Sequence, residues 1–169
     1  AYIFERDVNG TWSQKQKIQA TDTQSYDNFG RRVSISGNYA IVGAYRNGGY
    51  WRGAAYIFER NVNGSWIQIE KLVSTDIEVN DMFGESVSIS GSYAIVGSSG
   101  EDTGGNKAGA AYVFEIDIDG SWNEVHKIQA SDKAAEDRFG ETVSISGNYA
   151  IVGAIQEDAD SNDDGGNIA

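Results

Sequence analysis

Phe83-Gly-Glu-Ser-Val-Ser-Ile-Ser-Gly-Ser-Tyr-Ala-Ile-Val-Gly97 is the stretch that decides the fold of this chain. Close copies of it occupy residues 29–43 and 139–153. Within it, Ser-Val-Ser-Ile-Ser alternates polar and apolar side chains, as a half-buried strand does, and Tyr-Ala-Ile-Val suits a strand covered on both faces. A repeat of about 55 residues indicates a propeller, solenoid or array, in which each unit buries its apolar face against a neighbour.

Each repeat contains four strand-like segments. In the second repeat they are residues 56–60, 66–73, 85–90 and 93–96, and Val62-Asn-Gly-Ser65 and Gly91-Ser92 mark two of the turns between them. Asn-Gly between such segments is a strong hairpin signal, because both residues tolerate positive φ. Four antiparallel strands in about 55 residues match one propeller blade. We therefore expect an all-β chain with repeats at 1–54, 55–110 and 111–169.

Composition excludes several classes of protein. The chain has 21 glycines, no proline and no cysteine, so disulfides and thiolate metal sites are absent. A net charge of −12 argues against nucleic-acid binding. No run approaches the length of apolar sequence that a membrane helix needs, so membrane insertion is not expected.

The repeated sequence segments resemble those of a known family. Phe-Gly followed by Ser-Val-Ser-Ile-Ser-Gly, then Tyr-Ala-Ile-Val-Gly and Ala-Tyr-Ile-Phe-Glu, is similar to the FG-GAP repeat in all three copies. The resemblance implies a β-propeller like that of integrin α-subunits, in the branch found in bacterial extracellular or cell-surface proteins. It also implies that the Phe-Gly strand is the innermost strand A, Tyr-Ala-Ile-Val is B, Ala-Tyr-Ile-Phe is C and the Trp strand is the outermost D.

This phasing predicts two complete blades and two half-blades, since the sequence starts at a strand C and stops after a strand B. Closed propellers usually have four to eight blades. We therefore expect either part of a longer propeller or a homo-oligomer, in which residues 149–152 of one copy pair with residues 2–4 of the next.

Because the strands alternate in direction, the B–C and D–A loops should lie at the same end of the blades. They form the candidate binding surface, because binding residues usually occupy variable loops and the B–C loop carries all the variation in length. The first B–C loop combines aromatic rings with arginines, which are favoured at recognition surfaces. The candidate ligand-binding residues are Tyr45, Arg46, Tyr50, Trp51 and Arg52. The alternative is that Tyr50 and Trp51 pack against the adjoining blade.

The third B–C loop has the oxygen spacing of a calcium loop. Its candidate ligands are Asp158, Asp160, Asn162 and Asp164, and Gly165 would make the turn. The bidentate glutamate that normally completes such a loop is missing, so a solvated acidic loop is the alternative. The sequence requires no cofactor, and calcium is the only ion for which it offers a candidate site. The A–B turn, where the integrin-type repeat carries calcium, is here only Ser-Gly-Asn-Tyr or Ser-Gly-Ser-Tyr.

Residues present in every repeat are assigned to structure, because a catalytic group is rarely needed three times. The aromatic set is expected to form the core between blades and consists of Phe29, Phe83, Phe139, Trp12, Trp66 and Trp122. The repeated aspartates are expected to cap loops by accepting backbone N–H groups; they are Asp22, Asp76, Asp132, Asp27, Asp81 and Asp137.

The sequence thus predicts a binding or adhesion module, not an enzyme, that recognises a protein or carbohydrate through its loop face. The alternative is a structural subunit whose terminal half-blades pair between chains into a ring or filament. His126, the one histidine, has no nucleophile or second histidine in a catalytic pattern beside it.

Overall fold

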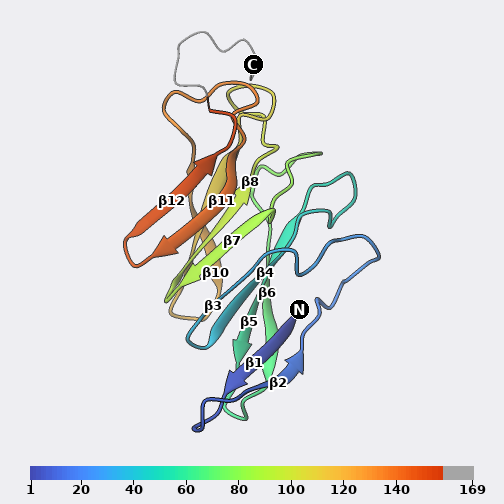
Figure 1. The fold of residues 1–169 in the computed structure, drawn as a ribbon. Coiled ribbons are helices and arrows are strands. Elements are labelled where there is room, and N and C mark those ends of the chain that lie inside the picture. The colour runs from blue at the N-terminus through green and yellow to red at the C-terminus, as the bar shows by residue number, and fades with distance from the viewer. Residues whose placement is uncertain (158–169) are drawn as a thin grey trace.

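The computed structural model describes residues 1–157, which form twelve β-strands and no helix (Figure 1). Over this range, no segment therefore provides a helix able to cross a membrane. The strands are β1 (Tyr2–Arg6), β2 (Trp12–Lys17), β3 (Val33–Ser36), β4 (Tyr39–Ala44), β5 (Ala54–Arg60), β6 (Trp66–Leu72), β7 (Ser86–Ser90), β8 (Tyr93–Ser98), β9 (Ala110–Ile116), β10 (Trp122–Ile128), β11 (Phe139–Ser146) and β12 (Tyr149–Ala154).

The strands form two complete propeller blades and two half-blades. Strands β3 to β6 make a four-stranded antiparallel sheet in chain order, the first blade, and β7 to β10 make the second blade in the same order. Strands β1 and β2 form an N-terminal half-blade, and β11 and β12 form a C-terminal one. The expected all-β architecture and the A-B-C-D order within each blade are confirmed. Figure 1 shows the two half-blades at opposite ends of the stack.

The C–D turns follow from side-chain chemistry. In the first blade the Asn61 side-chain oxygen accepts the backbone N–H groups of Asn63 and Ser65, both at 3.0 Å. Gly64 between them has a φ of 82°, which glycine adopts without steric cost. A short polar residue and a glycine at fixed positions thus reverse the chain between β5 and β6.

Two glycines let neighbouring blades approach closely. A Cβ atom on Gly43, in β4, would collide with the backbone carbonyl of Gly84, and one on Gly84 would collide with that of Ala54. Gly97 and Gly140 stand in the same relation one blade further along. Neighbouring blades can therefore pack this closely only if the residues after Phe and after Ile-Val are glycine.

The hydrophobic core lies between successive blades. One cluster joins Ile41 and Ile57 of the first blade to Phe83, Tyr112 and other side chains of the second. A second cluster joins Ile18, which follows the N-terminal half-blade, to Val42 and Tyr56 of the first blade. Each blade therefore buries its apolar surface against its neighbour.

The expected burial of the repeated aromatic residues is wrong for three of the six. Phe83, Trp66 and Trp122 are buried, whereas Phe29 and Phe139 are only half-buried and Trp12 is 65% exposed. The difference follows from position in the stack. Phe83 lies between two complete blades, whereas Trp12 and Phe139 belong to half-blades and Phe29 lies between a half-blade and the first complete blade. One covering layer is therefore missing over these three residues in the described part of the chain.

Candidate functional site

The B–C loop of each blade is held by the D–A loop that enters the next blade. In the first blade the carbonyls of Tyr50, Trp51 and Arg52 accept the N–H groups of Asn80, Met82 and Phe83 at 2.8, 2.9 and 2.9 Å. In the second blade the carbonyls of residues 106, 107 and 108 accept those of residues 136, 138 and 139 at 2.8 to 3.0 Å. The loop face is therefore a hydrogen-bonded rim that joins the blades.

This pairing holds two aromatic residues in an unusual backbone conformation. Tyr50 and Trp51 have φ values of 48° and 56°, in the left-handed region that bulky residues rarely adopt. Such a conformation costs on the order of 1–3 kcal/mol per residue and persists only where the surrounding structure enforces it. The hydrogen bonds to the next blade supply that constraint, while the Tyr50 side chain remains 81% exposed.

Arginine side chains stack on the aromatic rings of this loop. The Arg46 guanidinium carbon lies 4.8 Å from the ring centre of Trp51 and 5.3 Å from that of Tyr45. Arg31 lies 4.9 Å from the Tyr45 ring centre, and its Nη1 donates to the Tyr45 hydroxyl at 2.8 Å. Each such contact contributes about 0.5–1 kcal/mol at an exposed site. We call Arg31, Tyr45, Arg46, Tyr50, Trp51 and Arg52 the arginine–aromatic cluster.

The structure brings the five candidate ligand-binding residues onto one loop but gives them different roles. Tyr45 is 4% exposed and therefore supports the cluster from below. Tyr50, Trp51 and Arg52 are exposed, and Arg46 is half-buried. The backbone of Tyr50 and Trp51 does bind the adjoining blade, as the structural alternative expected, yet their side chains remain accessible.

Arg31 belongs to the cluster and was missed by the sequence reasoning. The signal for it was a departure from the repeat: Arg31 and Tyr45 of the first blade stand where Glu85 and Ser99 stand in the second. Ser99 donates its hydroxyl to Glu85 at 2.5 Å, so both blades bond the same two positions with different chemistry. The exchange places positive charge on the first blade in a chain whose net charge is −12.

The second blade carries an acidic counterpart at the same end. A hollow of about 250 Å³ is lined by six residues, namely Asp76, Glu78, Asp81, Glu101, Asp102 and Thr103. Burial raises the pKa of Asp81, and nearby carboxylates, including Glu101, raise it further. The Lys127 ammonium binds Glu101 at 2.8 Å and Asp76 at 2.6 Å. Residues 1–157 contain no group of three or more metal-ligating side chains arranged to hold an ion.

The repeated aspartates divide into two roles. Asp27, Asp81 and Asp137 cap their loops as expected, each accepting a backbone N–H three residues earlier at 2.6 to 2.8 Å. Asp22 and Asp76 differ from that expectation, because each binds a tyrosine hydroxyl and a lysine ammonium of the following repeat.

The two contacts of this second kind have nearly the same geometry. Asp22 accepts from Tyr56 at 2.8 Å and from Lys71 at 2.5 Å. Asp76 accepts from Tyr112 at 2.9 Å and from Lys127 at 2.6 Å. Burial, and then Asp76, raises the pKa of Tyr112 far above its ordinary value. We call each of these contacts, in which an aspartate binds a tyrosine hydroxyl and a lysine ammonium of the following repeat, a cross-repeat clamp.

The calcium candidates Asp158, Asp160, Asn162 and Asp164 lie outside the described residues. The calcium hypothesis for them stays a prediction.

Comparison with known families gives three matches along the chain. The FG-GAP repeat matches residues 12–58, 66–114 and 122–168, so each matched segment starts at a Trp strand. No curated protein matched the chain significantly.

Proposed function

Because this chain belongs to the FG-GAP repeat family, whose repeats are generally non-catalytic binding modules, we propose that it is a binding or adhesion module whose ligand contacts the arginine–aromatic cluster. The proposal includes an extracellular or cell-surface location, in a bacterium. It follows from the family resemblance.

One observation carries the proposal: Tyr50 and Trp51 present exposed rings from a backbone that the next blade holds in place. A rigid aromatic surface loses little conformational entropy when a ligand binds. Arg46, stacked on Trp51, adds a positive charge beside the ring. A flat apolar surface flanked by guanidinium groups suits a ligand with a carboxylate or sulfate next to a ring or apolar face, as in an acidic oligosaccharide or an acidic protein segment.

The charge distribution supports an anionic ligand. Arg31, Arg46 and Arg52 lie on the first blade, whereas the second blade presents Glu78 and Asp102 at the same end. An anion is therefore attracted to one part of the loop face and repelled from the other, which orients it on approach.

The experiment is a binding screen of the whole chain against arrays of neutral oligosaccharides, uronic-acid oligosaccharides and acidic peptides. The Tyr50→Ala/Trp51→Ala double variant should lose binding to the acidic ligands by at least about tenfold, as expected when central aromatic contacts are removed. The matched control removes two exposed side chains at C–D turns, Val62→Ala with Ile118→Ala, and should bind as the wild-type chain does.

Arg46→Gln should weaken binding and reduce its dependence on salt, because one charge contact is lost. Binding that is equal in the Tyr50→Ala/Trp51→Ala variant and the control, or confined to neutral ligands, would contradict the proposal.

A further inference from the structure

The C–D turn is built in the same way in every repeat, but its third residue differs. The turns are residues 7–10, 61–64 and 117–120, and in each the N–H of the final glycine donates to the carbonyl of the first residue at 2.9 to 3.0 Å. The third residue is Asn9 in the first turn and Asn63 in the second, whereas it is Asp119 in the third. The same turn therefore accepts both the amide and the carboxylate side chain.

An asparagine followed by a glycine is a chemically reactive pair. The backbone nitrogen of the glycine can attack the carbonyl carbon of the asparagine side chain, and glycine has no Cβ atom to obstruct the approach. The chain contains three such pairs, which begin at Asn9, Asn47 and Asn63. The dipeptide is the same in all three, so the surroundings of each amide decide whether it reacts.

The structure separates these three asparagines. Asn9 and Asn63 are exposed, and in residues 1–157 their side-chain amides form no hydrogen bond. Asn47 is only 5% exposed; its Nδ2 donates to Asp27 at 3.1 Å, and its Oδ1 accepts from the Lys71 ammonium at 2.8 Å. The Asn47 amide is therefore fixed by its neighbours, while the other two amides are free to rotate.

An arginine lies beside the glycine of each asparagine turn. The Arg6 Nη2 atom is 3.0 Å from the point that a Cβ atom of Gly10 would occupy. At Gly64 the corresponding distance to Arg60 Nη2 is 3.6 Å. Ile116 stands at this position in the third repeat, whose turn carries aspartate. A guanidinium at this place stabilises negative charge on the attacking nitrogen and on the side-chain oxygen during the attack.

Asp119 shows how the turn binds a carboxylate. Its Oδ1 accepts the Ser121 N–H at 2.9 Å and the Ser121 hydroxyl at 2.5 Å. These bonds hold the pKa of Asp119 below its ordinary value, so its ionised form is favoured. Thr11 and Ser65 stand at the position of Ser121 and provide the same two donors.

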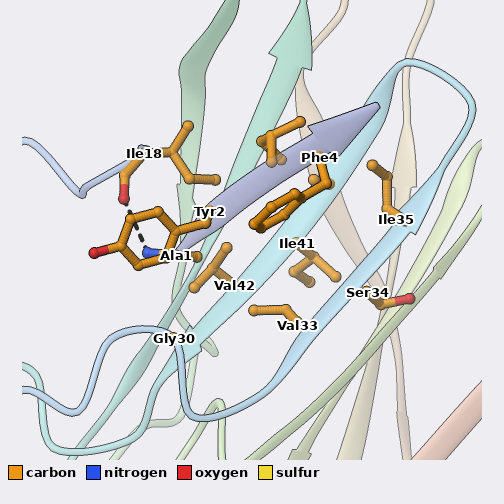
Figure 2. A pocket seen from close by; sticks show the side chains of 12 residues that line it. Ala1, Tyr2, Phe4, Ile18, Gly30, Val33, Ser34, Ile35, Ile41 and Val42 are labelled. Atoms are coloured by element: carbon orange, nitrogen blue, oxygen red, sulfur yellow. Dashed lines mark hydrogen bonds between the residues drawn. The ribbon is translucent and has the colours of Figure 1, made fainter. Parts of the chain in front are cut away.

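The surroundings of Asn63 also suit an added negative charge. Asn63 shares a hollow of about 300 Å³ with the cationic Arg60 and Lys15. It does not line the apolar cavity of about 480 Å³ beside β1, around which Figure 2 shows side chains such as Ile41 and Val42. A carboxylate at residue 63 therefore lies near cations and not in an apolar site, where its desolvation would be costly.

We propose that Asn9 and Asn63 are sites of spontaneous deamidation, promoted by the neighbouring arginines, and that Asn47 is protected from it. The glycine N–H loses its proton to hydroxide, and the nitrogen attacks the asparagine Cγ to form a five-membered succinimide. The bond between Cγ and Nδ2 breaks, and the amide nitrogen takes up a proton and leaves as ammonia. One water molecule then opens the ring at Cγ, which leaves an aspartate and restores the main chain.

The positions of the three pairs relate this chemistry to the rest of the molecule. The C–D turns lie at the end of the blades opposite to the loop face, because successive strands run in opposite directions. Conversion there adds negative charge, in a chain whose net charge is −12, away from the arginine–aromatic cluster. Asn47 belongs to the same B–C loop as the cluster, so its protection preserves the loop that is proposed to bind the ligand.

The test is incubation of the folded wild-type chain at neutral and mildly alkaline pH, with peptide mass spectrometry to follow each asparagine. Asn9 and Asn63 should convert at least about tenfold faster than Asn47, whose two hydrogen bonds must first open. In denaturing urea the three rates should become similar, because only the fold distinguishes the pairs. Asn38 is exposed but precedes Tyr39, so it controls for exposure alone and should convert slowly.

Variants test the flanking charge and the product. Arg60→Gln should slow conversion at Asn63 severalfold and leave Asn9 unchanged, and Arg6→Gln should do the reverse, so each turn is the control for the other. Asn63→Gln lengthens the side chain by one carbon and should abolish the mass change at that turn. Asn63→Asp is the product form and should unfold at the wild-type urea concentration. Circular dichroism spectra with the wild-type strand signal show that each variant is folded.

Three results would overturn the proposal. They are equal rates at Asn47 and Asn63 in the folded chain, conversion of Asn9 and Asn63 in urea but not in the folded chain, and arginine variants whose turns convert at the wild-type rate. The arginine–aromatic cluster is unchanged in all of these variants, so ligand binding and deamidation fail independently.

Discussion

Phe83→Ala should be the most destabilising of the three Phe-Gly substitutions. Phe83 is fully buried between the two complete blades, and its ring packs edge-to-face on Tyr112 and Phe114 at centroid distances of 5.5 and 6.1 Å. Removing a buried phenylalanine ring costs about 3–5 kcal/mol, because apolar burial is lost and a cavity remains. The two ring contacts, worth about 0.5–1.5 kcal/mol each beyond burial, place the expected value in the upper half of that range.

The repeat provides matched controls for this value. Phe29 has the same two edge-to-face contacts, with Tyr56 and Phe58 at 5.7 and 6.1 Å, but is half-buried. Phe29→Ala should therefore cost roughly half as much, since the transfer free energy scales with the area removed from water. Phe139 is also half-buried, and no ring among the described residues packs on it, so Phe139→Ala should cost least.

The assay is urea unfolding followed by tryptophan fluorescence and far-ultraviolet circular dichroism. The wild-type chain and all three variants are compared at one protein concentration, because any association would contribute to the measured stability. The expected order of destabilisation is Phe83, then Phe29, then Phe139. Equal losses at the three positions, or a loss below about 1 kcal/mol for Phe83→Ala, would refute the reasoning that burial between complete blades sets the cost.

Three further predictions follow from the other contacts and the acidic loop. Burial opposes the charged form of Asp76, but hydrogen bonds from Lys127 and Tyr112 hold the pKa of this carboxyl below its ordinary value of 3.8. The ionised Asp76 therefore contributes fully to the free energy of unfolding above pH 3.8, and this contribution is lost as the pH falls through the folded pKa. Asp76→Asn should therefore lose less stability than wild type between about pH 5 and pH 2 in urea melts, and parallel pH profiles would contradict this. The Ser88 hydroxyl accepts the Ile145 N–H at 3.1 Å. Ser88→Ala leaves this N–H without its acceptor and should cost about 1–2 kcal/mol by urea unfolding. Ser144→Ala, whose hydroxyl accepts no backbone N–H in residues 1–157, should cost almost nothing; equal costs would be inconsistent with a stabilising role for the Ser88 hydrogen bond. If calcium binds the third B–C loop, calorimetry should give a Kd of about 10⁻⁴–10⁻³ M that Asp160→Ala with Asp164→Ala abolishes, and no heat at millimolar calcium would leave a solvated acidic loop.

The sequence alone was sufficient for the architecture, because each determinant of it is local. Alternation in Ser-Val-Ser-Ile-Ser predicts a half-buried strand, Asn-Gly predicts a hairpin turn, and the regular return of both predicts blades. The strands begin and end within a few residues of their expected bounds; β6, for example, ends at Leu72 and was expected to end at Val73. These signals depend on neighbours a few positions away in the chain.

Only the tertiary structure decided which copy of a repeated residue is buried and what it binds. Phe29, Phe83 and Phe139 have nearly the same local sequence but different exposures, because burial depends on the layer that covers a residue and not on its own strand. The same holds for Tyr45, which the sequence offered as a ligand-binding residue and which lies beneath the loop, supporting Arg31 and Arg46. The Asp76 clamp to Tyr112 and Lys127 joins residues 36 and 51 positions apart. Short-range patterns cannot specify such contacts, since they form only when one blade packs against the next.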